Sequence, residues 1–350
     1  MSAARPPEGA RAAVRSTKDS PVGAERQRLL VLGAGGFIGR HVVAALQASD
    51  WARPVAASRS GRLAPGTPPV EVLRLDARDP DALRRAAAQA AGVVDCTAAG
   101  PAGIVAGAQA LQAAWQHEAA PPRLVYLSSM AVYGDAEGRV DETAARVAAE
   151  PASYGGAKAA AEALLARRAG ETVVLRPGCV YGADSPQWSL RIARLLRSRR
   201  IGDLGAGGDG LCNAVHADDL AQAVLAALRV PEAAGQAFNL SLPDPPTWNG
   251  YFLAFARALG AVPLARIGAR RMAFETQVAA LPLRLAERAA QLLRLPADRL
   301  PPAIPPSLAR LWRQEIRLDV SRAGQVLGLR WTPLAQGLRE TAEGMAGGPP

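Results

Sequence analysis

Cysteine and histidine are scarce in this chain, with three of each among 350 residues. The cysteines are scattered and odd in number, which excludes a disulfide framework, and neither residue recurs at the spacing of a metal site. We therefore expect no metal and a reducing compartment, the cytoplasm. Apolar runs stay below the ~18 residues that a membrane-spanning helix requires, so no such span is predicted.

Aromatic residues make up only 5% of the chain and are not interleaved with its basic residues, although the net charge is +10. Such a charge has two interpretations: binding to nucleic acid or an anionic membrane, or solvated helix faces. The basic residues form no compact stripe in the sequence. This favours solvated faces, so we expect a small-molecule substrate and neither nucleic acid nor membrane as a partner.

The segment 281–295 combines leucines with Arg284, Arg288 and Arg294, so membrane binding must also be considered for this segment. It predicts either a helix on a membrane surface or a helix that packs its leucines inward. Glu287 and the flanking prolines interrupt a continuous basic face, which favours inward packing.

Apolar strand-like runs alternate with Ala-rich helical segments over the first half of the chain. This alternation predicts an α/β fold with a doubly wound, Rossmann-like parallel sheet. The expected strands are 27–32, 54–57, 70–75, 93–96, 123–127 and 172–175, and the expected helices are 37–47, 79–91, 104–117 and 153–169.

The rhythm changes after residue 176, and from residue 243 the chain is helical and punctuated by prolines. We expect further helices at 188–200 and 217–228 and a strand at 237–240. The predicted parts are a disordered tail (1–26), a dinucleotide-binding domain (27–176 with 211–240), a smaller, mainly helical substrate-binding lobe (177–210 with 241–343) and a frayed tail (344–350).

A glycine-rich turn connects the first predicted strand to the first helix, with Gly33, Gly36 and Gly39 in a G-x-x-G-x-x-G spacing. Glycine lets the backbone turn tightly and approach a pyrophosphate. The helix that Phe37 and Ile38 open directs its free amides and its dipole at that anion. The turn therefore predicts a dinucleotide site.

The end of the second predicted strand bears on the choice between NADP and NAD. A carboxylate there would bind a ribose 2′-hydroxyl, but the segment contains Arg59 and no acid. Arg59, assisted by Arg40, would hold a 2′-phosphate, so NADP is preferred and NAD is the alternative. Asp76, after the third strand, would bind the adenine amine or cap the helix that begins near Asp79.

Lysine is almost absent: Lys18 and Lys158 are the only two in the chain, and Lys158 follows Tyr154 by four residues. Helix positions i and i+4 share a face, so the phenol and the ammonium are predicted to point into one pocket. The cation would lower the pKa of the phenol from about 10, which makes Tyr154 usable as a general acid or base. Ser129, at the end of the fifth strand, would hydrogen-bond the reacting oxygen.

Taken in order across about residues 27–240, these motifs resemble the extended short-chain dehydrogenase/reductase family, also called the NAD-dependent epimerase/dehydratase family. The pieces that carry the resemblance are the glycine turn, Asp76–Asp79, Ala98-Ala99, Ser128–Gly134, Tyr154-x-x-x-Lys158, Arg176–Gly182 and His216–Ala221.

The resemblance implies a role for each matching residue. Tyr154 would be the general acid/base, Lys158 would bind the nicotinamide ribose, and Ser129 would polarise the reacting oxygen. Ala77, Ala98 and Pro177 would contact the cofactor, and Cys179 the substrate. Relatives often form homodimers through the helices that match 104–117 and 153–169.

Two departures from the family pattern bear on function. Met130-Ala131 replaces the acidic pair of sugar-nucleotide 4,6-dehydratases, and Cys179 replaces an Asn that contacts nucleotide substrates. They favour an NAD(P)-dependent oxidoreductase that transfers hydride between nicotinamide and a carbonyl or alcohol carbon of a small organic substrate. Two alternatives stay open: a nucleotide-sugar epimerase that retains its cofactor, and a non-catalytic dinucleotide-binding or RNA-associated protein.

Overall fold

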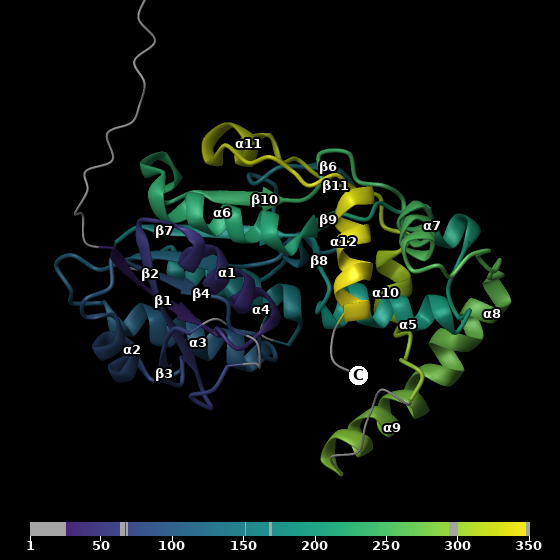
Figure 1. Ribbon diagram of the computed structural model, residues 1–350, viewed down its shortest axis with the longest axis horizontal. Coiled ribbons are helices and arrows are strands. Elements are labelled where there is room, and N and C mark those ends of the chain that lie inside the picture. The colour runs from purple at the N-terminus through teal and green to yellow at the C-terminus, as the bar shows by residue number, and fades with distance from the viewer. Residues whose placement is uncertain are drawn as a thin grey trace, which may run out of the picture.

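A seven-stranded parallel sheet forms the centre of the molecule, with strand order β10-β7-β5-β4-β1-β2-β3 (Figure 1). The computed structural model describes residues 26–63, 67, 69–150, 152–167, 170–293 and 300–347. The strands are β1 (Gln27–Leu32), β2 (Ala52–Ser58), β3 (Glu71–Arg74), β4 (Gly92–Asp95), β5 (Arg123–Leu127), β7 (Thr172–Pro177) and β10 (Ala237–Leu240). The predicted doubly wound sheet is confirmed. Its strand order reverses between β1 and β4, because β2 and β3 lie on one side of β1 and the later strands on the other.

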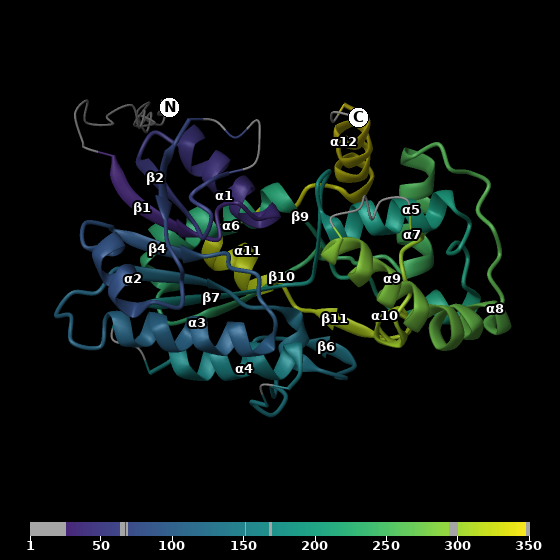
Figure 2. The ribbon, with the colours of Figure 1, turned by 90° about the horizontal axis from the view of Figure 1, so that it is seen from below.

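Helices cover both faces of this sheet (Figure 2). One face carries α1 (Phe37–Ala48), α6 (Ala217–Arg229) and α11 (Ser321–Leu327), and the other carries α2 (Pro80–Ala87), α3 (Pro101–Ala114) and α4 (Tyr154–Leu165). Strand β1 shows why both faces of the sheet must be covered by helices. Leu29 and Val31 enter the core of the first face and Leu30 and Leu32 that of the second, as the two-residue period of a strand requires.

The helical C-terminal region packs around an aromatic cluster of its own. The Trp248 and Trp312 rings lie 6.4 Å apart, and Phe252 meets Trp312 edge-on at 5.4 Å. All three side chains are fully buried. The helices here are η2 (Pro186–Leu190), α5 (Arg191–Arg197), η3 (Gly205–Gly208), α7 (Trp248–Ala258), α8 (Ala269–Ala273), η5 (Phe274–Ala279), α9 (Ala280–Leu292), α10 (Pro306–Leu311) and α12 (Leu334–Gly347).

Short elements connect this region to the sheet. They are η1 (Met130–Tyr133), β6 (Gly138–Val140), β8 (Cys179–Tyr181), β9 (Ala214–His216) and β11 (Ile316–Leu318). A further short helix, η4 (Pro231–Ala233), joins α6 to β10. Strand β6 pairs with β11, and β8 with β9, both in parallel. Residues far apart in the sequence thereby meet beside the carboxyl edge of the central sheet.

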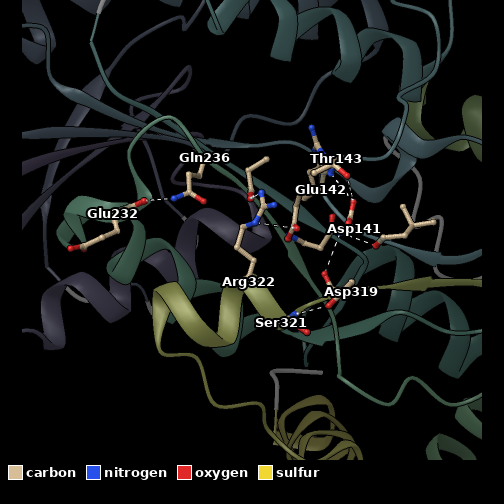
Figure 3. A network of polar contacts seen from close by, with 12 residues as sticks. Asp141, Glu142, Thr143, Glu232, Gln236, Asp319, Ser321 and Arg322 are labelled. Carbon is tan, nitrogen blue, oxygen red and sulfur yellow. Dashed lines mark hydrogen bonds and ion pairs between the residues drawn. The ribbon is translucent and has the colours of Figure 1, made fainter.

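A polar network, shown in Figure 3, protects the edge strand β10. The Glu142 carboxylate accepts a hydrogen bond from the Asn239 amide (2.8 Å) and pairs with Arg322 Nε of α11 (3.5 Å). At the start of α11, Asp319 accepts a hydrogen bond from the Ser321 amide (2.9 Å). The network holds α11 against β10, so the unpaired side of this strand is covered.

The structure bears on three predictions for the outer segments of the chain. The prediction that the leucines of 281–295 pack inward is wrong for Leu281, Leu285 and Leu292, which are 64%, 58% and 84% exposed, because α9 packs through Ala280 and Ala290 on its other face. Residues 294 and 295 lie outside the described residues, as do 1–25 of the predicted N-terminal tail. Helix α12 runs to residue 347, so the first four residues of the predicted C-terminal tail are helical.

Within the described part of the chain, none of the helices combines the length and apolarity that crossing a membrane requires.

Candidate active site

A cavity of about 850 Å³ opens at the carboxyl edge of the sheet, beside the reversal between β1 and β4. Doubly wound sheets bind ligands at this position. The sheet side supplies residues that follow β4, β5 and β7, and the opposite wall comes from η2 and α10. Among the predicted site residues, the lining includes Phe37, Ile38, Ala98, Ser129, Tyr154, Lys158, Pro177 and Cys179.

The other predicted residues lie beyond this lining, on the side of the edge formed by β1, β2 and β3. They are Gly33, Gly36, Gly39, Arg40, Arg59, Asp76 and Ala77. The site is therefore elongated along the sheet edge, as a dinucleotide requires.

The glycine turn has the geometry of a pyrophosphate cradle. Gly33 has a φ of +71°, and a Cβ there would lie 2.7 Å from the Cys96 carbonyl oxygen; a Cβ on Gly39 would lie 2.3 Å from the Gly33 oxygen. Helix α1 begins after Gly36 with no side-chain cap and no acid in its first turn. Its first amides are thus available to an anion, so these residues fit a dinucleotide.

Asp76 and Arg59 lie at the same end of the sheet. Asp76 Oδ2 pairs with Arg78 Nη2 at 2.6 Å. Its hydrogen bonds to Arg78 lower the pKa of Asp76 to about 2, and the charge of Arg59 adds to the effect. Asp76 does not cap α2, because Asp79 accepts the hydrogen bonds of the first-turn amides.

Arg40, just after the glycine turn, contacts an acid. Its Nη1 lies 3.2 Å from the exposed Asp184 carboxylate, which follows β8. Of the two predicted arginines, Arg59 is the exposed one at the end of β2.

Ser129 and Tyr154 come together because α4 begins against η1. A Cβ on Gly155 would lie 2.3 Å from the Ala131 carbonyl oxygen, so glycine is needed for this contact. Ser129 caps η1 by accepting a hydrogen bond from the Ala131 amide (3.2 Å), and its hydroxyl lies near enough to the Tyr154 phenol to favour the ionised form of that phenol. Tyr154 as a whole residue is 48% exposed, and it lines the cavity.

Lys158 is buried one turn further along α4 and is directed at β5. Its Nζ donates to the Leu127 carbonyl (2.6 Å) and to the Tyr126 hydroxyl (3.3 Å). The predicted lowering of the Tyr154 pKa is wrong for this arrangement: burial of its hydroxyl environment raises the pKa of Tyr154, and the nearby Ser129 hydroxyl opposes the rise. Tyr154 is therefore a protonated phenol at neutral pH, the form that can donate a proton.

Sequence analysis missed Asp95, a buried acid beside Lys158. It ends β4 directly opposite Tyr126 and is 5% exposed. Burial raises the pKa of Asp95, and the charge of Lys158 opposes this; burial lowers the pKa of Lys158, and the charge of Asp95 opposes that in turn. The two groups favour each other's ionised form. A charge inside the apolar run 93–96 was the available signal.

Glu162, also missed, is a buried acid that holds the cavity residue Ser128 from behind the lining. Its carboxylate accepts hydrogen bonds from Ser128 Oγ (2.5 Å), Arg146 Nη1 (2.6 Å) and two nitrogens of Arg176. Arg176 Nη1 continues the chain to the Tyr133 hydroxyl (2.8 Å). Because Ser128 precedes Ser129, this network fixes the backbone from which the Ser129 hydroxyl reaches the cavity.

The cavity lining is largely apolar. Among the described residues that line it, the charged ones are Lys158, Asp135 and Arg310, and the last two lie 4.0 Å apart. Cys179 is buried near Cys212, and burial raises the pKa of the Cys212 thiol. No group of His, Cys, Asp or Glu in the described ranges is arranged to hold a metal ion.

Comparison with known proteins gives the same family as the motifs. The family model described as "NAD dependent epimerase/dehydratase family" matches residues 29–241. A search of curated protein sequences gave no match.

Solved structures share the fold at low sequence identity. UDP-glucose 4-epimerase from Thermotoga maritima, with UDP-glucose, superposes with a TM-score of 0.68 at 18% identity over 91% of this chain and 99% of its own. UDP-glucuronic acid 4-epimerase from Bacillus cereus, with UDP-glucuronic acid and NAD, gives 0.66 at 18% over 91% and 99%. A putative epimerase from Burkholderia cenocepacia gives 0.64 at 23% over 92% and 99%.

Proposed function

Because this chain belongs to the NAD-dependent epimerase/dehydratase family, we propose that it is a nucleotide-sugar epimerase that retains its cofactor. The structural neighbours support this substrate class, since two of them were determined with UDP-sugars. In this reaction a carbinol carbon is oxidised and then reduced on its other face, with no net change in the cofactor. The epimerase alternative is thus preferred to the net oxidoreductase that the sequence favoured, and the family match leaves the non-catalytic alternative without support.

The dinucleotide, when bound, supplies the hydride acceptor and donor. The helix α1 amides would hold its pyrophosphate, and Arg59 and Asp76 would lie near its adenosine half. Lys158 would reach the nicotinamide ribose. The remaining proposed contacts are Gly33, Gly36, Phe37, Ile38, Gly39, Arg40, Ala77, Ala98 and Pro177.

The observation that carries the proposal is the placement of Ser129 and Tyr154 together at the cavity wall, one helical turn from Lys158. Tyr154 Oη would hold the proton exchanged with the substrate oxygen, and Ser129 would orient that oxygen. Lys158, kept charged by Asp95, would favour the phenolate once its ammonium turns from Leu127 toward the cavity. Cys179, in the cavity wall, would contact the substrate.

The decisive experiment begins with the cofactor of the purified protein. Denatured protein should release about one equivalent of NAD or NADP, and UDP-glucose or UDP-glucuronic acid should give its 4-epimer with no added cofactor. Tyr154→Phe should keep the dinucleotide and lose about 10²- to 10⁴-fold in turnover. Cofactor consumed in proportion to product would contradict the epimerase.

A second candidate is a net dehydrogenase or reductase of a less polar substrate. The charge of the cavity favours it, because Lys158 and Arg310 are the only cations among its described lining residues, whereas a nucleotide sugar brings a diphosphate. This candidate predicts reduction of a ketone panel with stoichiometric oxidation of NADPH or NADH, and no activity on UDP-sugars.

A further inference from the structure

An apolar stripe runs along the continuous helical segment formed by α8, η5 and α9. Phe274, Val278, Leu281, Leu285 and Leu292 are 57%, 59%, 64%, 58% and 84% exposed. Their spacings of four, three, four and seven residues place them on one face of the helix. Exposed apolar residues that form a contiguous patch mark an interaction surface.

The segment is anchored by its opposite face, so the stripe is not the result of a loosely packed helix. Met272, Thr276 and Ala280 are buried against the helical region. The two acids of the segment are also turned to the protein: Glu275 is buried and pairs with Arg200, and Glu287 accepts a hydrogen bond from the Ala303 amide (3.1 Å).

The exposed charges of the segment are therefore all positive. Arg270, Arg271, Arg284 and Arg288 are exposed, and between residues 269 and 293 no carboxylate is. The Arg271 guanidinium donates a hydrogen bond to the Arg199 carbonyl oxygen (2.9 Å), which leaves its positive charge uncompensated by this contact. The result is a stripe of aliphatic and aromatic side chains bordered by arginines.

We propose that the surface of α8, η5 and α9 docks on an anionic membrane surface, with the apolar stripe in the headgroup boundary and the arginines on lipid phosphates. Amphipathic helices with basic flanks bind anionic bilayers in this way. A second copy of the chain fits less well, because it would bring four arginines against four. Figure 1 shows α9 extending away from the body, so a flat surface can reach it.

Vesicle binding by the full chain tests the proposal. We expect co-sedimentation with vesicles of phosphatidylcholine and phosphatidylglycerol and none with phosphatidylcholine alone. The pair Leu281→Asn and Leu285→Asn should weaken binding by at least about tenfold, because two inserted side chains are lost. The matched pair Leu253→Asn and Val262→Asn, exposed apolar residues off the stripe, should leave it unchanged.

A charge-matched comparison tests the arginines. Arg284→Gln with Arg288→Gln should weaken binding several-fold and reduce its salt dependence, whereas Arg85→Gln with Arg330→Gln, exposed elsewhere, should not. Thermal unfolding of each variant should match the parent chain, since every site is on the surface.

Three outcomes would overturn the proposal: no binding to anionic vesicles, equal binding to neutral ones, or equal loss in the off-stripe controls. A concentration-dependent dimer that Leu281→Asn with Leu285→Asn abolishes, without vesicle binding, would assign the face to a second copy. Tyr154→Phe should bind vesicles like the parent chain, so this result is separate from that of the proposed epimerase.

Discussion

Glu162 of α4 and Arg176 of β7 form a two-bond ion pair in the interior, with Nε–Oε1 and Nη2–Oε2 distances of 3.0 and 2.7 Å and side-chain exposures of 2% and 4%. Substituting Glu162→Gln removes the charge that compensates a buried guanidinium. We expect the free energy of unfolding to fall by about 3 kcal/mol, as for other broken buried pairs. Urea unfolding would measure it.

The matched control is Glu71→Gln, which removes a carboxylate that is 43% exposed and pairs with Arg28 (3.3 Å) and with the exposed Arg53 (3.9 Å). Its cost should stay below about 1 kcal/mol, because solvent screens exposed pairs. Equal costs for the two substitutions would show that the Glu162–Arg176 pair does not stabilise the fold beyond a surface contact.

The same carboxylate should make stability depend on pH in the acid range. Burial alone would raise the pKa of Glu162, but the hydrogen bonds and charge of Arg176 lower it overall from 4.5. A lowered folded-state pKa means that the contribution is complete above the unfolded value and is lost as the pH falls through the folded one. The stability gap between the parent chain and Glu162→Gln should therefore be constant from pH 7 to about 5 and narrow toward pH 3. A gap that is constant down to pH 3 would contradict this.

Asp95 offers a test of how Lys158 is kept charged. Asp95→Asn preserves the oxygen that accepts the Thr97 amide (2.9 Å) but removes the charge that raises the pKa of Lys158. The basic limb of the pH–rate profile should move to lower pH by about one unit, since an opposite charge at close range shifts a pKa by that much or more.

Asp50→Asn, at an exposed site after α1, is the control and should leave the profile in place. A lower turnover with no movement of the basic limb would mean that Asp95 affects structure alone.

The sheet was predictable because its signal is local. Apolar runs flanked by turn residues gave β1, β5 and β10 to the residue, and the glycine spacing located the turn before α1. Ser129 follows the end of a strand and Tyr154 begins a helix, and both kinds of boundary can be predicted from the local sequence.

The missed residues depend on partners distant in the sequence. Glu162 is a single acid in an Ala-rich helix, so the local sequence predicts that its side chain is solvated. Its burial is possible because Arg176, 14 residues away on a strand, pairs with the carboxylate. The direction of the Lys158 ammonium depends on the Leu127 carbonyl, and the outward face of Leu281 depends on which side of α9 meets the lobe. Tertiary packing decides each of these, and the sequence pattern alone leaves them open.

The cofactor prediction has its sharpest test at Arg59, which follows β2 where an NAD-specific enzyme would carry an acid. If its guanidinium meets a 2′-phosphate, Arg59→Gln should weaken NADP binding by about tenfold or more, the value of one charge-assisted hydrogen bond, and leave NAD binding unchanged. Fluorescence titration of protein stripped of dinucleotide would measure both affinities. Arg62→Gln, exposed three residues later, controls for the general loss of a positive charge. If NAD binds the parent chain at least ten times more tightly than NADP, the proposed role of Arg59 is contradicted. One structural neighbour was determined with NAD, but a shared fold does not fix the cofactor of this chain, so the titration is needed to measure its preference.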